Sequence, residues 1–212
     1  MNTVIDLQGV VALYGSHPAL AGATLHVERG EIVVVRGPNG AGKSSLLRLC
    51  AGLVAPSRGS AHVLGHDLAI DRERVGKRVG LLGQRNGLFL DLSAAENVRF
   101  WGQLSGADDS EMEEAMRRMG IAEGLAGRRV GAMSTGQRKR VALACLVARR
   151  AELWLLDEPH SGLDAAGRDE LDDVLRAAAS SGATIVLASH ESERAERLRA
   201  RVVTMSGGQV VS

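Results

Sequence analysis

The feature that most constrains the fold is a glycine-rich segment, GPNGAGKS at residues 37–44, between an apolar run at 32–36, IVVVR, and a helical run, SLLRLCAGL. It fits the pattern G-x-x-x-x-G-K-[ST], whose glycines let consecutive backbone N–H groups converge on phosphate oxygens at a helix N-terminus. In that arrangement Lys43 would bridge the β- and γ-phosphates and Ser44 would ligate Mg²⁺. The segment predicts a nucleoside triphosphate site, and several classes of triphosphatase share the pattern. The residues expected to contact the nucleotide are Gly37, Pro38, Asn39, Gly40, Ala41, Gly42, Lys43, Ser44 and Ser45.

Short β-branched runs alternate with helical patterns along the chain, which indicates an α/β fold with a mainly parallel sheet. Several runs are apolar throughout, as expected of strands that have helices on both faces. With 212 residues, of which 45% are apolar, the chain is long enough for one full-sized core. The expected core strands are residues 32–36, 79–82, 153–157, 184–189 and 201–205.

The middle third of the chain has a helical character. The segment SAAE at 93–96 has the spacing of a capping box that opens a helix. A second helix is expected over 108–119, because its acidic residues come first, its arginines come last, and its Met and Ala side chains share one face. We therefore expect a helical lobe at 86–149 inserted into a nucleotide-binding core formed by 1–85 and 150–212.

Two adjacent carboxylates, Asp157 and Glu158, follow the apolar run LWLL. Because successive strand side chains face opposite ways, Asp157 can reach the metal while Glu158 is directed elsewhere. We assign Asp157 to Mg²⁺, and Glu158 as the general base or water-positioning group for attack on the γ-phosphate, a role worth about 10²–10⁴-fold. A pair of solvated acids at a strand end is the alternative.

His190 ends another apolar run, 184–189, and is expected to face the γ-phosphate from the same sheet edge as Asp157. A polar residue with satisfied hydrogen bonds is the alternative. The other histidines, His160 among them, lack this context and are interpreted as structural or exposed.

Composition argues against several classes of function. A net charge of +1 gives no electrostatic reason to expect nucleic acid. Cys50 and Cys145 lie inside apolar runs and are interpreted as buried free thiols. We recognise no secretory signal, and the longest apolar stretch, 141–148, is far shorter than the ~20 residues of a membrane span. A cytoplasmic chain is expected, so a transport role would require a separate membrane subunit.

The segment MSTGQ, residues 133–137, opens a long helical run. Its Ser hydroxyl, its Gly and the helix N-terminus suit a second phosphate site. With the order of the other motifs, it resembles the L-S-G-G-Q signature of the ABC ATPase family, and the resemblance covers essentially the whole chain. It implies a P-loop NTPase (RecA-like) core with a small antiparallel β subdomain and an inserted α-helical subdomain. It also implies a transporter subunit that binds ATP and Mg²⁺ and hydrolyses ATP.

The resemblance implies that the signature faces the γ-phosphate held by a second copy, so that two copies enclose two ATP molecules. Gln84 would touch Mg²⁺ or the attacking water, Asp164 would lie at the dimer interface, and Tyr14 would stack on adenine. A transmembrane permease subunit would hold the chain at the inner face of the cell membrane. The residues added to the site by the resemblance are Ser134, Gly136, Gln137, Gln84, Asp164 and Tyr14.

A second segment, MSGGQ at 205–209, matches the signature pattern more closely. It lies between two apolar runs, and no helix can follow in the three residues after it. Its Ser-Gly-Gly is therefore interpreted as a hairpin turn. The signature itself departs from the family at Thr135, which puts a β-branched side chain where the backbone approaches phosphate. Cys145 and Ala200 stand where the family usually carries Arg and Asp.

Within the family, the compact length and the segments 96–101 and 153–159 are similar to the haem exporter ATP-binding subunits of cytochrome c biogenesis. Another small ABC exporter or importer, a soluble ABC-type ATPase and a cassette that binds ATP without hydrolysing it are the alternatives. The segment 88–92, LFLDL, is more apolar than a loop requires. We expect it to line a groove that accepts a short helix of the membrane subunit.

Overall fold

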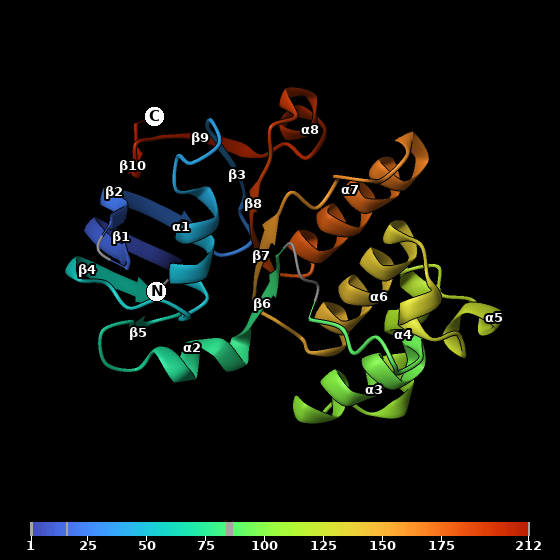
Figure 1. The fold of residues 1–212 in the computed structure, drawn as a ribbon. Coiled ribbons are helices and arrows are strands. Elements are labelled where there is room, and N and C mark those ends of the chain that lie inside the picture. Colours follow the sequence, from blue (N-terminus) through green and yellow to red (C-terminus); the bar gives the residue numbers. More distant parts are fainter. Residues whose placement is uncertain (1, 16, 84–86, 212) are drawn as a thin grey trace.

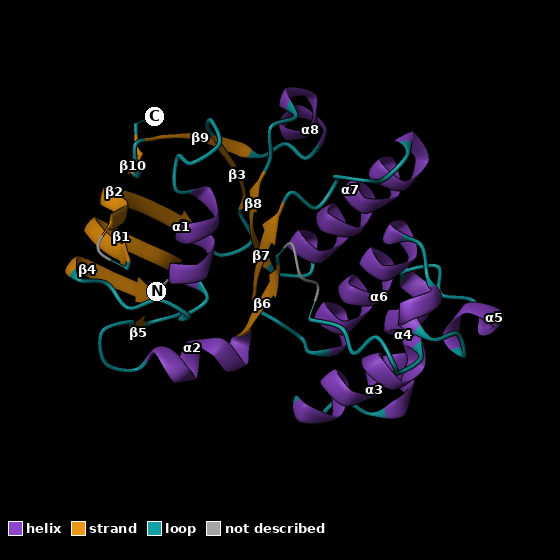
Figure 2. Cartoon of the chain, viewed as in Figure 1, coloured by secondary structure: helices purple, strands orange, loops and turns teal. Residues whose placement is uncertain are grey.

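The computed structural model describes residues 2–15, 17–83 and 87–211, which form two β-sheets and a set of helices (Figures 1 and 2). The strands are β1 (Thr3–Tyr14), β2 (His17–Glu28), β3 (Ile32–Arg36), β4 (Arg58–Val63), β5 (His66–Asp67), β6 (Val79–Leu82), β7 (Leu153–Asp157), β8 (Thr184–Ala188), β9 (Arg201–Ser206) and β10 (Gln209–Val210). The helices are α1 (Lys43–Cys50), α2 (Arg72–Arg78), α3 (Ala94–Leu104), α4 (Asp109–Arg118), α5 (Glu123–Ala126), the 3₁₀ turn η1 (Val130–Ala132), α6 (Thr135–Ala148), α7 (Ala165–Ser180) and α8 (Ser192–Arg197).

The central sheet has the order β10-β9-β3-β8-β7-β6, and all of its pairs are parallel except β9 with β10. This confirms the expected α/β class and all five predicted core strands, with small differences at two ends. The strand expected over 184–189 ends at Ala188, and the strand expected over 201–205 continues to Ser206.

Alternate residues of the central strands enter two different hydrophobic cores. In β3, Val33 and Val35 face the core that contains α1 and the antiparallel sheet, whereas Ile32 and Val34 face the core beneath α6 and α7. Figure 1 shows these two layers on opposite sides of the sheet. Because both faces are covered, β3, β7 and β8 have no polar side, which explains their nearly continuous apolar sequences.

The second sheet is antiparallel, with the order β2-β1-β4-β5. It supplies the small antiparallel β subdomain that the resemblance implies. The segment 205–209 is confirmed as a hairpin, since Met205 pairs with Val210 and Ser206 with Gln209. Gly207 and Gly208 both have positive φ, 54° and 79°, as a tight two-residue hairpin turn requires.

Helices α3, α4 and α6 pack together and form the helical part of the molecule. The capping box at α3 is confirmed: the Glu96 carboxylate accepts from Ser93 N at 2.7 Å, and Ser93 Oγ accepts from Glu96 N at 3.2 Å. The expected Met and Ala face of α4 is buried, with Met112 and Ala115 inside the second core. The boundaries of this lobe, 86–149, stay a prediction.

Among the described residues, no helix has the length and apolar character that crossing a membrane requires. Cys50 and Cys145 are both buried and unpaired, as predicted, and burial raises the pKa of each thiol to about 12.

Candidate functional site

The glycine-rich loop joins the end of β3 to α1, as the sequence predicts. Two of its glycines cannot be replaced without displacing backbone. Gly37 has φ 148°, and a Cβ there would lie 2.3 Å from the carbonyl oxygen of Met205. Gly42 has φ 102°, and a Cβ there would lie 2.7 Å from the carbonyl oxygen of Ala19. The loop is therefore held against both β9 and β2, with its N–H groups at the start of a helix.

Lys43, the first residue of α1, folds its side chain back over the loop. Its Nζ donates to the carbonyl oxygens of Gly37 at 2.7 Å and Pro38 at 3.1 Å, and it lies 3.4 Å from His190 Nε2. The ammonium is thus already placed at the mouth of the loop.

Ser44 and Asp157 meet at the junction of α1 and β7. Ser44 Oγ donates to Asp157 Oδ2 at 2.6 Å, although the two residues are far apart in sequence. A hydroxyl and a carboxylate are the hard oxygen ligands that Mg²⁺ prefers. The donor pair therefore fits the metal role that the sequence predicts.

Glu158 lies beside His190, which follows β8. Its Oε1 lies 3.2 Å from His190 Nε2, and its backbone N–H donates to Ala188 O at 3.0 Å. Its φ is 49°, a left-handed conformation that costs a residue other than Gly on the order of 1–3 kcal/mol. No pattern in the sequence predicts this backbone conformation.

These groups line one pocket of about 570 Å³. It contains residues of the glycine-rich loop, both carboxylates and His190, as predicted, and two lining residues that sequence reasoning did not assign to the nucleotide, Ala19 and Ser161. Ala19 has no chemical signature; it reaches the site because β2 passes beside Gly42.

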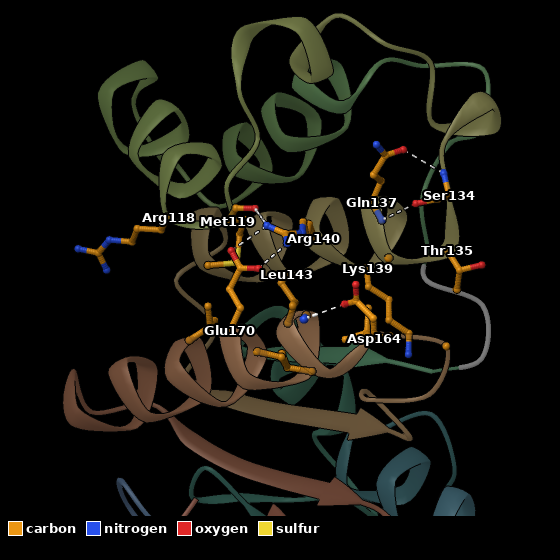
Figure 3. Close-up of a pocket in the computed structure, with 16 residues that line it drawn as sticks. Arg118, Met119, Ser134, Thr135, Gln137, Lys139, Arg140, Leu143, Asp164 and Glu170 are labelled. Atoms are coloured by element: carbon orange, nitrogen blue, oxygen red, sulfur yellow. Dashed lines mark hydrogen bonds and ion pairs between the residues drawn. The ribbon is translucent and has the colours of Figure 1, made fainter. Parts of the chain in front are cut away.

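The signature lies elsewhere, in a separate pocket of about 540 Å³ between α6 and α7 (Figure 3). Ser134 caps α6: its Oγ accepts from Gln137 N at 3.3 Å, while Gln137 Oε1 accepts from Ser134 N at 3.0 Å. Asp164 also lines this pocket and caps α7 through Gly167 N at 2.9 Å. The structure thus brings the signature to Asp164, and different residues line the P-loop pocket.

Two predicted site residues remain. Tyr14, at the end of β1, is 77% exposed, and it does not line the P-loop pocket. Gln84 lies outside the described residues. Thr135, the departure from the signature, packs beside the loop that follows β7, since a Cβ on Gly162 would lie 3.4 Å from the Thr135 methyl group.

His160 is more than a generic structural histidine. It is buried two residues after Glu158, and its Nε2 lies 2.8 Å from Asp172 Oδ1 of α7. Arg194 of α8 donates to Asp172 Oδ2 at 2.8 Å and to Asp169 at 2.8 Å. Burial raises the pKa of Asp172, but the hydrogen bonds from His160 and Arg194 outweigh it and hold that pKa below its ordinary value.

Comparisons with known proteins identify the family. The family model described as ABC transporter matches residues 20–161. The daunorubicin resistance ATP-binding protein DrrA3 of Streptomyces coeruleorubidus is 36% identical, over 100% of this chain and 68% of its own length. The cytochrome c biogenesis ATP-binding export protein CcmA of Bordetella bronchiseptica is 42% identical, over 78% of this chain and 75% of its own.

Solved structures share the fold. The dimeric bacterial ABC transporter cassette MJ0796 superposes with a TM-score of 0.88 at 26% identity, covering 98% of this chain and 97% of that one. A post-hydrolysis dimer of the same cassette, bound to ADP and Pi, gives a TM-score of 0.87 at 25% identity and covers 98% and 97%. The chain therefore belongs to the ABC transporter family, as an ATP-binding and ATP-hydrolysing subunit.

Proposed function

We propose that this chain hydrolyses ATP with Glu158 as the general base, Asp157 and Ser44 as Mg²⁺ ligands, and His190 as the group that faces the γ-phosphate. The observation that carries the proposal is the convergence of β7, β8 and the P-loop on one pocket. There, Ser44 contacts Asp157 at 2.6 Å, and Glu158 lies 3.2 Å from His190. Lys43, at the same mouth, would stabilise charge on the transferred phosphoryl group.

Substitution of Glu158 tests this assignment. Glu158→Gln keeps the shape and removes the base, so we expect ATP binding to persist and turnover to fall by about 10²–10⁴-fold. Steady-state phosphate release and binding of a fluorescent ATP analogue measure the two quantities. Equal turnover in wild type and variant would show that Glu158 is not the base.

The active unit in this proposal is a pair of chains. The signature and the P-loop line different pockets of one chain, and in this proposal each ATP molecule lies between the P-loop of one copy and the signature of the other. A two-fold arrangement would give two equivalent ATP sites, each with one P-loop and the partner copy's signature. Similarity to a dimeric cassette supports this arrangement. We expect Glu158→Gln with ATP to elute as a dimer in size-exclusion chromatography, and a persistent monomer would contradict it.

An aromatic cluster would receive the membrane subunit. The rings of Phe89, Phe100 and Trp101 contact one another, with centroids 4.9–6.4 Å apart, and Phe89 is 43% exposed. Asn97 fixes the backbone of Phe89 through hydrogen bonds of 2.8 and 3.0 Å, so the exposed ring is held in place. A pocket of about 210 Å³, lined by Trp101 and Arg149, adjoins it. These features support the predicted groove for a short helix of a permease.

Phe89→Glu tests the groove without touching the P-loop pocket. We expect ATP hydrolysis by the isolated chain to stay within about twofold, while co-purification with the membrane subunit is lost, because a charge in the groove opposes an apolar helix. Intact assembly and transport would rule out this surface.

The cargo in this proposal is haem, exported for cytochrome c biogenesis. The identity to CcmA over three quarters of both chains supports it. A competing candidate is drug export, because the likeness to DrrA3 covers the whole chain. The names of both relatives, and that of a Nod factor export protein at 30% identity, describe efflux or resistance, which favours export over import.

Deletion of the gene in its own organism separates the two cargoes. Loss of covalently bound haem from cytochrome c, restored by the wild-type gene and not by Glu158→Gln, would support haem export. Normal cytochrome c with increased daunorubicin sensitivity would favour drug export, and no change in either would reject both.

A further inference from the structure

Lys139 is a buried cation in the helix that begins at the signature. It lies in α6 and is 9% exposed. Its Nζ donates to the carbonyl oxygens of Glu158 at 3.3 Å and Pro159 at 2.7 Å, and also to that of Ser161. All three acceptors belong to the loop that directly follows β7. Figure 3 shows Lys139 extending from α6 toward the loop that contains Asp164, whereas its neighbour Arg140 meets Glu170 of α7.

The three carbonyl oxygens suit an ammonium group. An ammonium has three N–H donors, and each finds an acceptor here; a neutral amine would have only two. Burial lowers the pKa of Lys139, and the charge of Glu158 opposes that shift. A buried lysine without such partners would be strongly destabilising, so the loop and the cation stabilise each other.

The loop needs this support because Glu158 is strained. With φ at 49°, its backbone persists only if neighbouring groups hold it. Ala188 of β8 accepts from the N–H of Glu158 at 3.0 Å, which fixes one side. On the other side, the carbonyl oxygen of Glu158 accepts from Lys139 Nζ at 3.3 Å and from Ser161 N at 3.2 Å. The two peptide groups that flank the Glu158 Cα are therefore both pinned.

We propose that Lys139 is a positioning residue for ATP hydrolysis: its ammonium holds the loop after β7 so that the Glu158 carboxylate lies beside His190. The proposal rests on the proposed role of Glu158 as base. It also connects two parts of the family machinery within one chain. Ser134, at the start of α6, would contact the ATP bound to the partner copy, while Glu158 acts on the ATP bound to its own chain. Lys139 links the two because it belongs to α6 and donates to the loop that contains Glu158.

Kinetics of Lys139→Met test the proposal. We expect kcat to fall about 10–100-fold, because small displacements of a catalytic group are costly, while KM for ATP changes less than about threefold. Lys139→Arg, which retains charge and donors, should recover part of kcat. The matched control is Arg117→Met, which removes a cation from the exposed face of α4. Arg117 pairs with Glu114 and lines neither the signature pocket nor the P-loop pocket, so kcat of this variant should stay within about twofold.

A double-mutant cycle separates positioning from general damage. If Lys139 acts through Glu158, Lys139→Met should lower turnover in the wild-type background and leave the residual turnover of Glu158→Gln unchanged. An equal loss in both backgrounds, or no loss in the wild-type background, overturns the proposal. If Lys139→Met does not fold, the same cycle is run with Lys139→Gln. If Glu158→Gln itself retains full turnover, the base assignment fails instead, so the two failures are distinguishable.

Discussion

Replacement of Asp172 should measure how much its buried contacts with His160 and Arg194 contribute to the free energy of unfolding. Its carboxylate is 2% exposed and receives His160 on one oxygen and Arg194 on the other, each at 2.8 Å. Asp172→Asn keeps the shape and removes the charge. The amide oxygen can still accept from His160, but the amide NH₂ would face the Arg194 guanidinium, donor against donor.

The expected loss of unfolding free energy depends on which ion-pair partners Arg194 keeps after the substitution. Breaking a buried charged pair by changing one partner costs about 3–5 kcal/mol. Arg194 keeps Asp169 at 2.8 Å and Glu191 at 3.4 Å, so we expect the lower end, about 3 kcal/mol. For a chain of this size, 1 kcal/mol corresponds to about 2–4 °C in Tm, so Tm should fall by about 6–12 °C.

The assay is thermal and urea unfolding of wild type and Asp172→Asn, with Asp173→Asn as control. Asp173 is the next residue of α7, is 71% exposed and pairs only at the surface with Arg176, so its loss should change stability by less than about 1 kcal/mol. A loss below 1 kcal/mol in Asp172→Asn as well would show that the buried pairing is not stabilising.

The effect of pH gives a second check on the same pair of proteins. The native pKa of Asp172 lies below its ordinary value of 3.8, so the stabilisation is present above that value and is lost as pH falls through the native pKa. The gap between wild type and Asp172→Asn should therefore shrink as pH falls below about 4. A gap that stayed unchanged down to the acid unfolding of the protein would contradict the assignment.

Three further predictions concern the metal ligand, the thiols and a helix cap. Ser44→Ala removes a proposed Mg²⁺ ligand. In a Mg²⁺ titration at fixed ATP, the Mg²⁺ concentration for half-maximal ATPase activity should therefore rise about tenfold or more. An unchanged titration would show that Ser44 is not a metal ligand. Cys50 and Cys145, with pKa values raised to about 12, should not react with a thiol reagent at pH 8 until urea unfolds the chain; fast labelling of the native protein would contradict their burial. Ser93→Ala removes one half of the α3 capping box and should cost about 1 kcal/mol, or about 2–4 °C in Tm, with Ser180→Ala as an exposed control.

The parts of the site that sequence reasoning found are those whose chemistry is local. The P-loop and the capping box at Ser93 depend on residues within a few positions of one another, so their spacing reveals them. Strands β3, β6, β7 and β8 could be predicted because each is buried on both faces, whereas β9 has exposed residues at both ends.

The parts that sequence reasoning missed depend on contacts between distant segments. The left-handed conformation of Glu158 is held by Ala188 and Lys139, which belong to different elements, and no local pattern announces it. His160 was interpreted without its partners, since Asp172 and Arg194 come from two later helices. A capping box at Asp108 also escaped notice, although Glu111 has the required spacing.

The backbone hydrogen bonds of Gly208 bear on when the P-loop can fold during synthesis of the chain. Its N–H donates to Ala41 O of the P-loop at 3.0 Å, and its carbonyl oxygen accepts from Ala21 N of β2 at 2.9 Å. The strand that precedes the P-loop, β3, pairs with β8 and β9. On the ribosome, residues 37–44 therefore emerge long before the segments that enclose them, and nucleotide cannot help the nascent chain to fold until residues 184–208 have been synthesised.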